Sequence, residues 1–152
     1  MSLANAITPH VEDLFQSAFA LLGDSRQAER AVSDTCRRAK ECLAESSTTP
    51  AGRSWIFGLL LEEARRGLRL FAGREDDETL GALRNLPAAE AEVIVLVDVQ
   101  GFRYQEAADA LGISRNELVE RLVPARRHFR TRVRPEIAGS AIQMEREATI
   151  QA

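Results

Sequence analysis

The residues best suited to bind another molecule lie in YQEAADALGIS at 104–114, a segment with the layout of a helix-turn-helix. A first helix with small residues lets a second helix cross it closely, and a glycine provides the tight turn between them. An apolar plug and a hydroxyl cap complete the pattern. These parts are Ala107, Ala108, Gly112, Ile113 and Ser114. The side chains that follow Ser114 would then face the major groove of DNA, although a plain αα-hairpin can share this pattern.

A dense run of arginines follows the same segment. RLVPARRHFRTRVR at 121–134 holds six arginines and no acid. Such a run is often only a solvated basic face at the end of a helix. Arginines at this density repel one another unless an anion is near, and a phosphate backbone supplies one. The run therefore favours DNA binding.

The elements that must position these residues are helices. The chain has 152 residues, 45% hydrophobic and only 5% aromatic, with a net charge of −3. Alanine, leucine, glutamate and arginine dominate, which favours helix over sheet. Because the whole chain is not basic, contact with nucleic acid must come from a local basic stripe. The sequence predicts an all-α fold.

Apolar periodicity and turn residues divide the chain into helices. VIVLV at 93–97 is β-branched, but the flanking Pro87 and Gly101 favour a helix there as well. Pro124 is expected to kink the last helix or divide it into two shorter ones. The predicted helices are Pro9–Leu22, Arg26–Leu43, Trp55–Phe71, Pro87–Gln100, Arg103–Leu111 and a last one from Ser114.

An acidic stretch without periodicity, AGREDDET at 72–79, is predicted to link two small domains. The predicted boundaries are 1–72 for the first domain, 73–79 for the linker, 80–134 for the second domain and 135–152 for a C-terminal tail. Each domain is long enough for a small helical core.

Enzymatic chemistry is not expected. Cys36 and Cys42 do not have metal-binding spacing, and His10 and His128 do not complete a ligand set. The acids Glu75–Asp77 are expected to be solvated linker charge. No phosphate-binding glycine loop, catalytic pairing or cofactor is expected. No membrane span or signal pattern is found, which predicts a cytoplasmic protein with reduced thiols.

The order of these elements resembles a bacterial sigma factor of the extracytoplasmic-function type. LPAAEAEVIVLVDVQGFRYQEAADALGIS resembles region 4 of that family, which ends in the helix-turn-helix. ALLGDSRQAERAVSDT resembles the polymerase-docking helix of region 2, and RSWIFGLLLEEARR resembles the helix that handles the melted promoter strand. The resemblance spans Leu14 to Arg130. It implies a three-helix region 2 domain and a region 4 domain, with core RNA polymerase, promoter DNA and an anti-sigma factor as partners.

The resemblance also implies roles for particular residues. The DNA-reading helix would present Arg115, Asn116, Glu117, Val119, Glu120 and Arg121, followed by Arg126, Arg127 and Arg130 at phosphates. The melted −10 strand would lie near Arg53, Glu62 and Arg66. The polymerase would contact Glu29, Arg30, Ser33 and Asp34.

Several positions depart from the family pattern. Where the family opens its DNA-reading helix with Gly-Thr-Val-Lys-Ser-Arg-Leu, this chain has NELVERL, which brings in Glu117 and Glu120. Carboxylates repel phosphates, although a glutamate can accept a hydrogen bond from the amino group of cytosine. Arg30, Ser33 and Glu62 also differ from the usual residues, and the linker is short.

A second interpretation follows from these departures. Some stress regulators carry a sigma-like domain that sequesters an anti-sigma factor and does not read DNA. That domain is fused to a phospho-receiver, which is not expected within these 152 residues, so on this interpretation the chain would be an excised fragment or a stand-alone mimic. The arginine run favours the DNA-reading interpretation.

Overall fold

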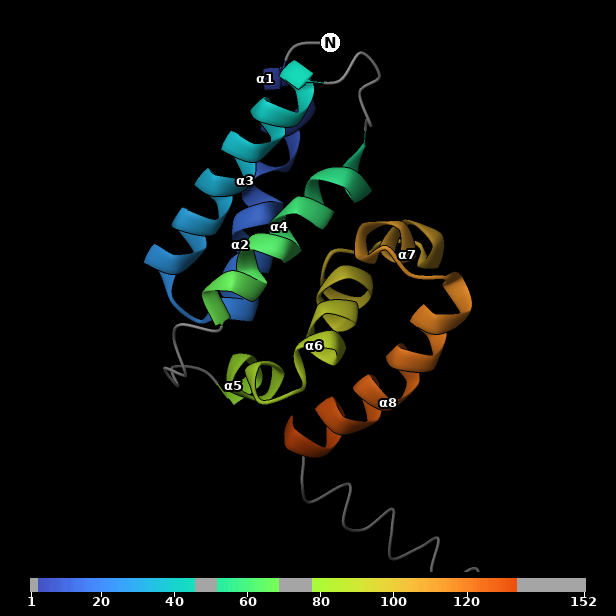
Figure 1. Ribbon diagram of the computed structural model, residues 1–152. Helices are drawn as coiled ribbons and strands as arrows, with labels where there is room; N and C mark the ends of the chain where they lie inside the picture. The colour runs from blue at the N-terminus through green and yellow to red at the C-terminus, as the bar shows by residue number, and fades with distance from the viewer. Residues whose placement is uncertain (1–2, 46–51, 69–77, 134–152) are drawn as a thin grey trace, which may run out of the picture.

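The computed structural model describes residues 3–45, 52–68 and 78–133, and within these ranges every regular element is helical (Figure 1). The expected all-α fold is confirmed. In chain order the elements are α1 Leu3–Ile7, η1 Thr8–His10, α2 Val11–Leu22, α3 Ser25–Glu45, α4 Arg53–Leu68, α5 Glu78–Arg84, α6 Ala88–Ile94, η2 Val95–Val99, α7 Tyr104–Leu111 and α8 Arg115–Val133.

The turn between α2 and α3 is built from the residues that the sequence marks for it. Gly23 ends α2 with φ 71°, and its backbone N–H donates to the carbonyl of Phe19 at 2.8 Å. The carboxylate of Asp24 accepts from the backbone N–H of Gln27 at 2.9 Å and caps α3. A side chain on Gly23 would collide with Arg84, which lies directly over it from α5. Glycine is favoured there by its backbone angle, whereas the flexible side chain of Arg84 could move aside for a larger residue.

The apolar run VIVLV is helical, as expected from its flanks. Pro87 precedes α6, and the helix continues into the wider turn η2, in which the N–H of Gln100 reaches the carbonyl of Val95. Gly101 follows with φ 67°, which redirects the chain toward α7. Because Val93, Ile94, Val95 and Leu96 are all buried, this helix is covered on nearly every side. Burial explains why β-branched residues are tolerated in it.

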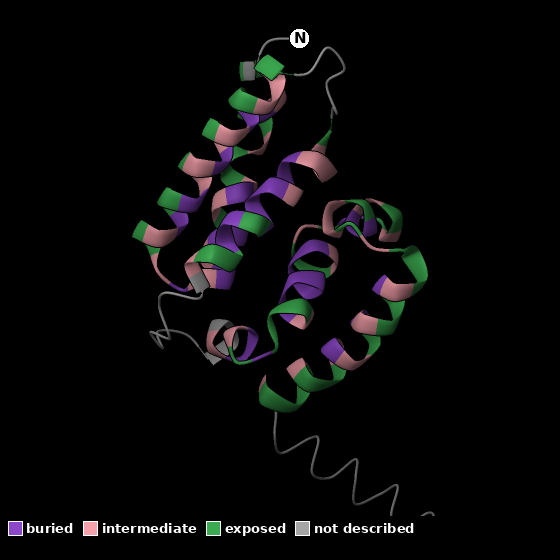
Figure 2. Cartoon of the chain, in the orientation of Figure 1, coloured by how far each residue is buried: buried purple, intermediate pink, exposed green. Residues whose placement is uncertain are grey.

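Helix α4 lies at the centre of the molecule. It packs against α2 and α3 on one side and against α7 on the other (Figure 1). Its buried residues, among them Ile56, Phe57, Leu60 and Leu61, belong to one hydrophobic cluster that runs through both halves of the chain (Figure 2). The two halves, α1–α4 and α5–α8, therefore share a continuous core.

Two details of the expected boundaries differ from the structure. Glu78 and Thr79, assigned to the linker, are the first residues of α5. Helix α4 is described as far as Leu68, so the expected end at Phe71 lies outside the described residues, as do most of the linker and the tail 135–152. Within the described residues, no helix has the length and apolar character of a membrane span.

Pro124 does not divide the last helix, so of the two expected outcomes, a kink or two shorter helices, the second is wrong. α8 runs unbroken from Arg115 to Val133 with Pro124 inside it. The missing N–H would have bonded the carbonyl of Glu120, which lies on the exposed side of the helix. Leu122 and Ala125, on either side of Pro124, are buried against the rest of the second half. Water can donate a hydrogen bond to the carbonyl of Glu120, and the burial of Leu122 and Ala125 keeps the helix continuous.

Replacing Pro124 with alanine should raise the free energy of unfolding by about 1–3 kcal/mol, because it restores a helical hydrogen bond where the helix already forms. Urea unfolding followed by circular dichroism measures the change. Val123→Ala, at an exposed position of the same turn, is the matched control and should shift the midpoint little. A lower midpoint for Pro124→Ala would show that the proline ring stabilises α8.

Candidate nucleic-acid interface

Helices α7 and α8 form a helix-turn-helix. α7 begins with a capping box in which Glu106 accepts from the backbone N–H of Arg103 at 2.9 Å, and it ends at Gly112 with φ 66°. This backbone donor is the main reason why the pKa of Glu106 lies below its ordinary value. Ala107 and Ala108 are fully buried at the helix crossing. Ser114 caps α8 by accepting from the N–H of Glu117 at 3.1 Å. These assignments agree with the sequence prediction.

The outer face of α8 is not covered by any other element among the described residues. Leu118, Leu122 and Ala125 anchor the helix inward, which leaves a continuous exposed stripe on the opposite side. The stripe consists of Arg115, Asn116, Val119, Glu120, Val123 and Arg127. Val119 and Val123 are 37% and 55% exposed, so two apolar side chains lie on this face. The packing of the two halves leaves this face open.

The two acids at the start of α8 are in different situations. Glu117 forms an ion pair with Arg121 at 2.6 Å, one helical turn on, so most of its charge is offset within the helix. Glu120 is exposed and forms no ion pair with any described residue. The carboxylate of Glu120 therefore remains on the outer face, and the guanidinium of Arg121 already pairs with Glu117.

The arginines beyond Pro124 separate into two kinds. Arg126 reaches Asp98 of η2 with two hydrogen bonds, at 3.0 and 2.6 Å, and this carboxylate raises the pKa of Arg126. This pair ties α8 to the helix beneath it. Arg127 and Arg130 are exposed and pair with no described side chain. Among the described residues, Arg132 is likewise exposed and unpaired, so the free cations on this part of α8 are Arg127, Arg130 and Arg132, with Arg126 committed to a structural contact.

The three residues expected near a melted strand are not brought together. Arg53 stands at the first turn of α4, against the second half of the chain. Glu62 pairs with Arg38 of α3 at 2.7 Å, and Arg66 pairs with Glu63 at 3.1 Å. Thirteen residues of helix, about 20 Å, separate Arg53 from Arg66. Arg53 alone faces the other half.

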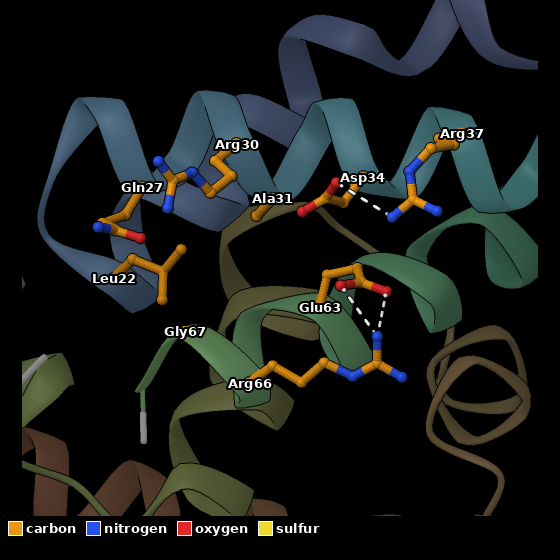
Figure 3. Close-up of a pocket in the computed structure, with 9 residues that line it drawn as sticks. All are labelled: Leu22, Gln27, Arg30, Ala31, Asp34, Arg37, Glu63, Arg66 and Gly67. Atoms are coloured by element: carbon orange, nitrogen blue, oxygen red, sulfur yellow. Dashed lines mark hydrogen bonds and ion pairs between the residues drawn. The ribbon is translucent and has the colours of Figure 1, made fainter. Parts of the chain in front are cut away.

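Two of the four expected polymerase contacts line a groove between α3 and α4. Arg30 and Asp34 stand on the α3 side, and Glu63 and Arg66 on the α4 side (Figure 3). The cavity has a volume of about 270 Å³ and is also lined by Leu22, Gln27, Ala31, Arg37 and Gly67. Glu29 and Ser33 are exposed on α3 but do not line it. The groove brings together Arg30 and Asp34, which were expected to contact the polymerase, and Arg66, which was expected near the melted strand.

The sequence did not indicate the ion pair between Arg65 and Glu92. The guanidinium of Arg65 on α4 donates to both oxygens of Glu92 on α6, at 2.7 and 2.8 Å. The side chain of Glu92 is only 3% exposed, so a charge from the second half is buried against an arginine from the first. The two residues lie 27 positions apart, and no local pattern joins them.

The comparisons with known proteins agree with this geometry. Residues 77–128 match the family model for sigma-70, region 4. A search of curated protein sequences finds no significant match. Among solved structures, CnrH in complex with the cytosolic domain of CnrY matches with a TM-score of 0.76 and 25% identity, over 88% of each chain.

Two further structures share the fold, both from Bartonella quintana and both at 19% identity. The sigma factor RpoE in complex with the anti-sigma factor NepR matches with a TM-score of 0.72, over 87% of this chain and 96% of that one. The anti-anti-sigma factor PhyR complexed with NepR matches with a TM-score of 0.70, over 94% of this chain and 59% of that one. Residues 77–128 thus match region 4 of the sigma-70 family, and the chain as a whole shares the fold of CnrH and of the sigma factor RpoE.

Removing Arg65 should cost far more stability than removing its neighbour. Arg65→Ala leaves the buried carboxylate of Glu92 without a partner, and we expect a loss of about 2–4 kcal/mol in the free energy of unfolding. Arg66→Ala is the matched control, since the buried carboxylate of Glu63 keeps Arg38 as a partner at 3.0 Å, and it should cost less than about 1 kcal/mol. Chemical denaturation measures both, and equal losses would contradict the burial argument.

Proposed function

We propose that this protein binds core RNA polymerase and directs it to promoters, with α8 reading the −35 element and the first half engaging the opened −10 region. The observation that carries the proposal is the helix-turn-helix of region 4, whose second helix keeps an outer face with unpaired arginines. Such a face is what major-groove binding requires.

Phosphate contact in this proposal belongs to Arg127 and Arg130. Both are exposed on the part of α8 beyond the reading positions, and neither is paired with a described carboxylate. Arg126 would hold α8 in position through Asp98 and contribute less to DNA. Each phosphate neutralised by an arginine releases a counterion and makes binding more sensitive to salt.

Base reading would use different chemistry from that of the usual family motif. The exposed methyl groups of Val119 suit contact with the C5-methyl of thymine, and the carboxylate of Glu120 suits the amino group of cytosine. Glu117, paired with Arg121, would present little repulsion to the phosphates. The departures from the family pattern then change which sequence is read.

The groove between α3 and α4 is the proposed docking surface for polymerase. Arg30 and Asp34 present opposite charges at its rim, and Glu29 and Ser33 extend the surface along α3. Arg30 pairs with no described side chain, so a carboxylate of the polymerase could bind it. The proposal includes no catalytic residue and no cofactor, and it places the protein in the cytoplasm, where the polymerase works.

Transcription in vitro is the direct test of this function. Core polymerase supplemented with the purified chain should transcribe from a subset of the promoter-containing fragments of its source genome, and core polymerase alone should not. Substituting Arg30→Glu should reduce the transcript yield by weakening polymerase binding. If no template is transcribed at saturating protein, the proposal is wrong.

The phosphate contacts predict a specific salt dependence. Arg127→Ala combined with Arg130→Ala should weaken binding to duplex DNA and lower the slope of log affinity against log salt by about 1.8, or 0.9 for each lost contact. A control removes the same charge from α3 through Arg26→Ala with Arg37→Ala. If both double variants change the slope equally, only the net charge matters and α8 has no special role.

The thymine contact predicts an effect of a single methyl group. We expect duplexes selected from a random pool to contain a thymine whose replacement by uracil weakens binding by about fourfold, the value of one buried methyl. Val119→Ala should bind both duplexes equally, whereas Val123→Ala should still distinguish them. Equal binding of wild-type protein to the two duplexes would contradict thymine reading by Val119.

A second candidate function is supported by the fold match to PhyR over 94% of this chain. In that case the chain would bind an anti-sigma factor and would not bind DNA. The exposed side chains of Val119 and Val123 would then contact the anti-sigma factor. Tight binding to a small helical anti-sigma protein, together with no binding to duplex DNA at low salt, would favour this function over promoter reading.

A further inference from the structure

Four exposed side chains of α8 lie along one line at the centre of its outer face. They are Asn116, Glu120, Val123 and Arg127, and their spacings of four, three and four residues place them on one side of a helix. The opposite side of α8 is buried against the rest of the second half, and the helix lies at the edge of the molecule (Figure 1). This outer line is therefore the part of α8 that would lie deepest in a major groove.

The carboxylate of Glu120 is kept free of a cationic partner by its own helical neighbours. The positions three and four residues away hold Asn116, Glu117, Val123 and Pro124, so no arginine lies within reach along the helix. Glu117, by contrast, has Arg121 one turn on and pairs with it. Glu120 therefore brings an uncompensated acceptor to the groove.

An ionised carboxylate can only accept hydrogen bonds, which restricts the bases that it can face. The donors of the major groove are the amino groups of adenine and cytosine. The amino group of adenine lies between two acceptors, its own N7 and O4 of the paired thymine. The amino group of cytosine has an acceptor on one side only, with the C5 position on the other. Because acceptors repel a carboxylate, cytosine suits Glu120 best.

Val123 lies beside Glu120 on the outer line. It is 55% exposed, and side chains three residues apart on a helix have their Cβ atoms about 5–6 Å from each other. The two side chains can therefore reach the same base edge. A base that satisfies both must present an amino group and an apolar group side by side.

None of the four ordinary bases has this combination. Thymine carries a methyl group next to an acceptor oxygen, and cytosine carries an amino group next to a hydrogen atom. Methylation of cytosine at C5 places the methyl group directly beside the amino group. The edge of 5-methylcytosine is thus the complement of a carboxylate next to an apolar side chain.

The two ends of the outer line are suited to hold this pair in register. Asn116, one turn before Glu120, can bind N6 and N7 of an adenine. Arg127, one turn after Val123, pairs with no described side chain and can reach a phosphate.

We propose that Glu120 and Val123 together read 5-methylcytosine, so that methylation of a promoter strengthens the binding of this chain. This inference rests on the proposed DNA-reading function and names the modified base that its reading helix prefers. Val119 lies off the outer line and is less exposed, at 37%, so it can contact a thymine elsewhere in the site.

Duplexes that differ in one base test the proposal. Starting from a duplex selected out of an unmodified random pool, each cytosine is replaced in turn by 5-methylcytosine or by thymine. At one position, 5-methylcytosine should bind about fourfold more tightly, the value of one buried methyl group. Thymine at that position should bind about tenfold more weakly, because its O4 faces the carboxylate. Fluorescence anisotropy at a fixed salt concentration measures both changes.

Two variants separate the contributions of the two side chains. Val123→Ala should lose the gain from the methyl group and still prefer cytosine over thymine. Glu120→Gln, whose amide can also donate, should lose that preference and keep the gain from the methyl group. Val119→Ala is the matched control and should keep both. All three positions are exposed, so these changes should leave the fold intact.

The proposal is overturned if 5-methylcytosine gives no gain at any position, or if the gain persists in Val123→Ala. It is also overturned if Val123 contacts the methyl group of a neighbouring thymine instead. In that case, uracil in place of this thymine would weaken wild-type binding and leave Val123→Ala unaffected. If the wild-type chain binds no duplex at low salt, promoter reading itself fails and the inference fails with it. Binding without any effect of cytosine methylation would refute the inference alone.

Discussion

The structure depends on the packing of α4 between the two halves of the chain. One side of this helix completes the core with α2 and α3, and the other meets α7 so closely that Gly58 has no room for a side chain. Because one helix serves both halves, the buried carboxylate of Glu92, the ring of Phe102 and the position of Arg53 all depend on this contact. A sigma-type chain with separate, unpacked domains would need none of these pairings.

The helix-turn-helix keeps its form despite residues that argue against DNA binding. Glu117 is offset by Arg121, and Pro124 is accommodated because its neighbours Leu122 and Ala125 are buried. The outer face of α8 presents the side chains of Val119 and Val123, the carboxylate of Glu120 and arginines that pair with no described side chain. A face of this kind can read bases by shape and methyl contact, with phosphates held further along the helix.

Local patterns were enough to predict most of the helices and several of their ends, but not α1 or α5. Gly23, Gly112 and Ser114 act on their immediate neighbours, so their roles follow from the sequence. Contacts between distant segments were not predictable in this way, since Arg65 and Glu92 belong to no local pattern. The same limit applies to Arg126, which stood in a run of free-looking arginines until the fold placed Asp98 beside it. Periodicity locates a helix but does not identify the side chain opposite it.

The distance between α3 and α8 tests the packed state most directly. Spin labels at Lys40→Cys and Thr131→Cys, both at exposed positions, can report it once Cys36 and Cys42 are replaced by alanine. The free chain should give a single narrow distance distribution, which should lengthen by roughly 20 Å when core polymerase and a promoter are added. A broad distribution in the free chain, or the same distance in the free and bound states, would contradict a chain whose two halves are packed together when free and separate on the promoter.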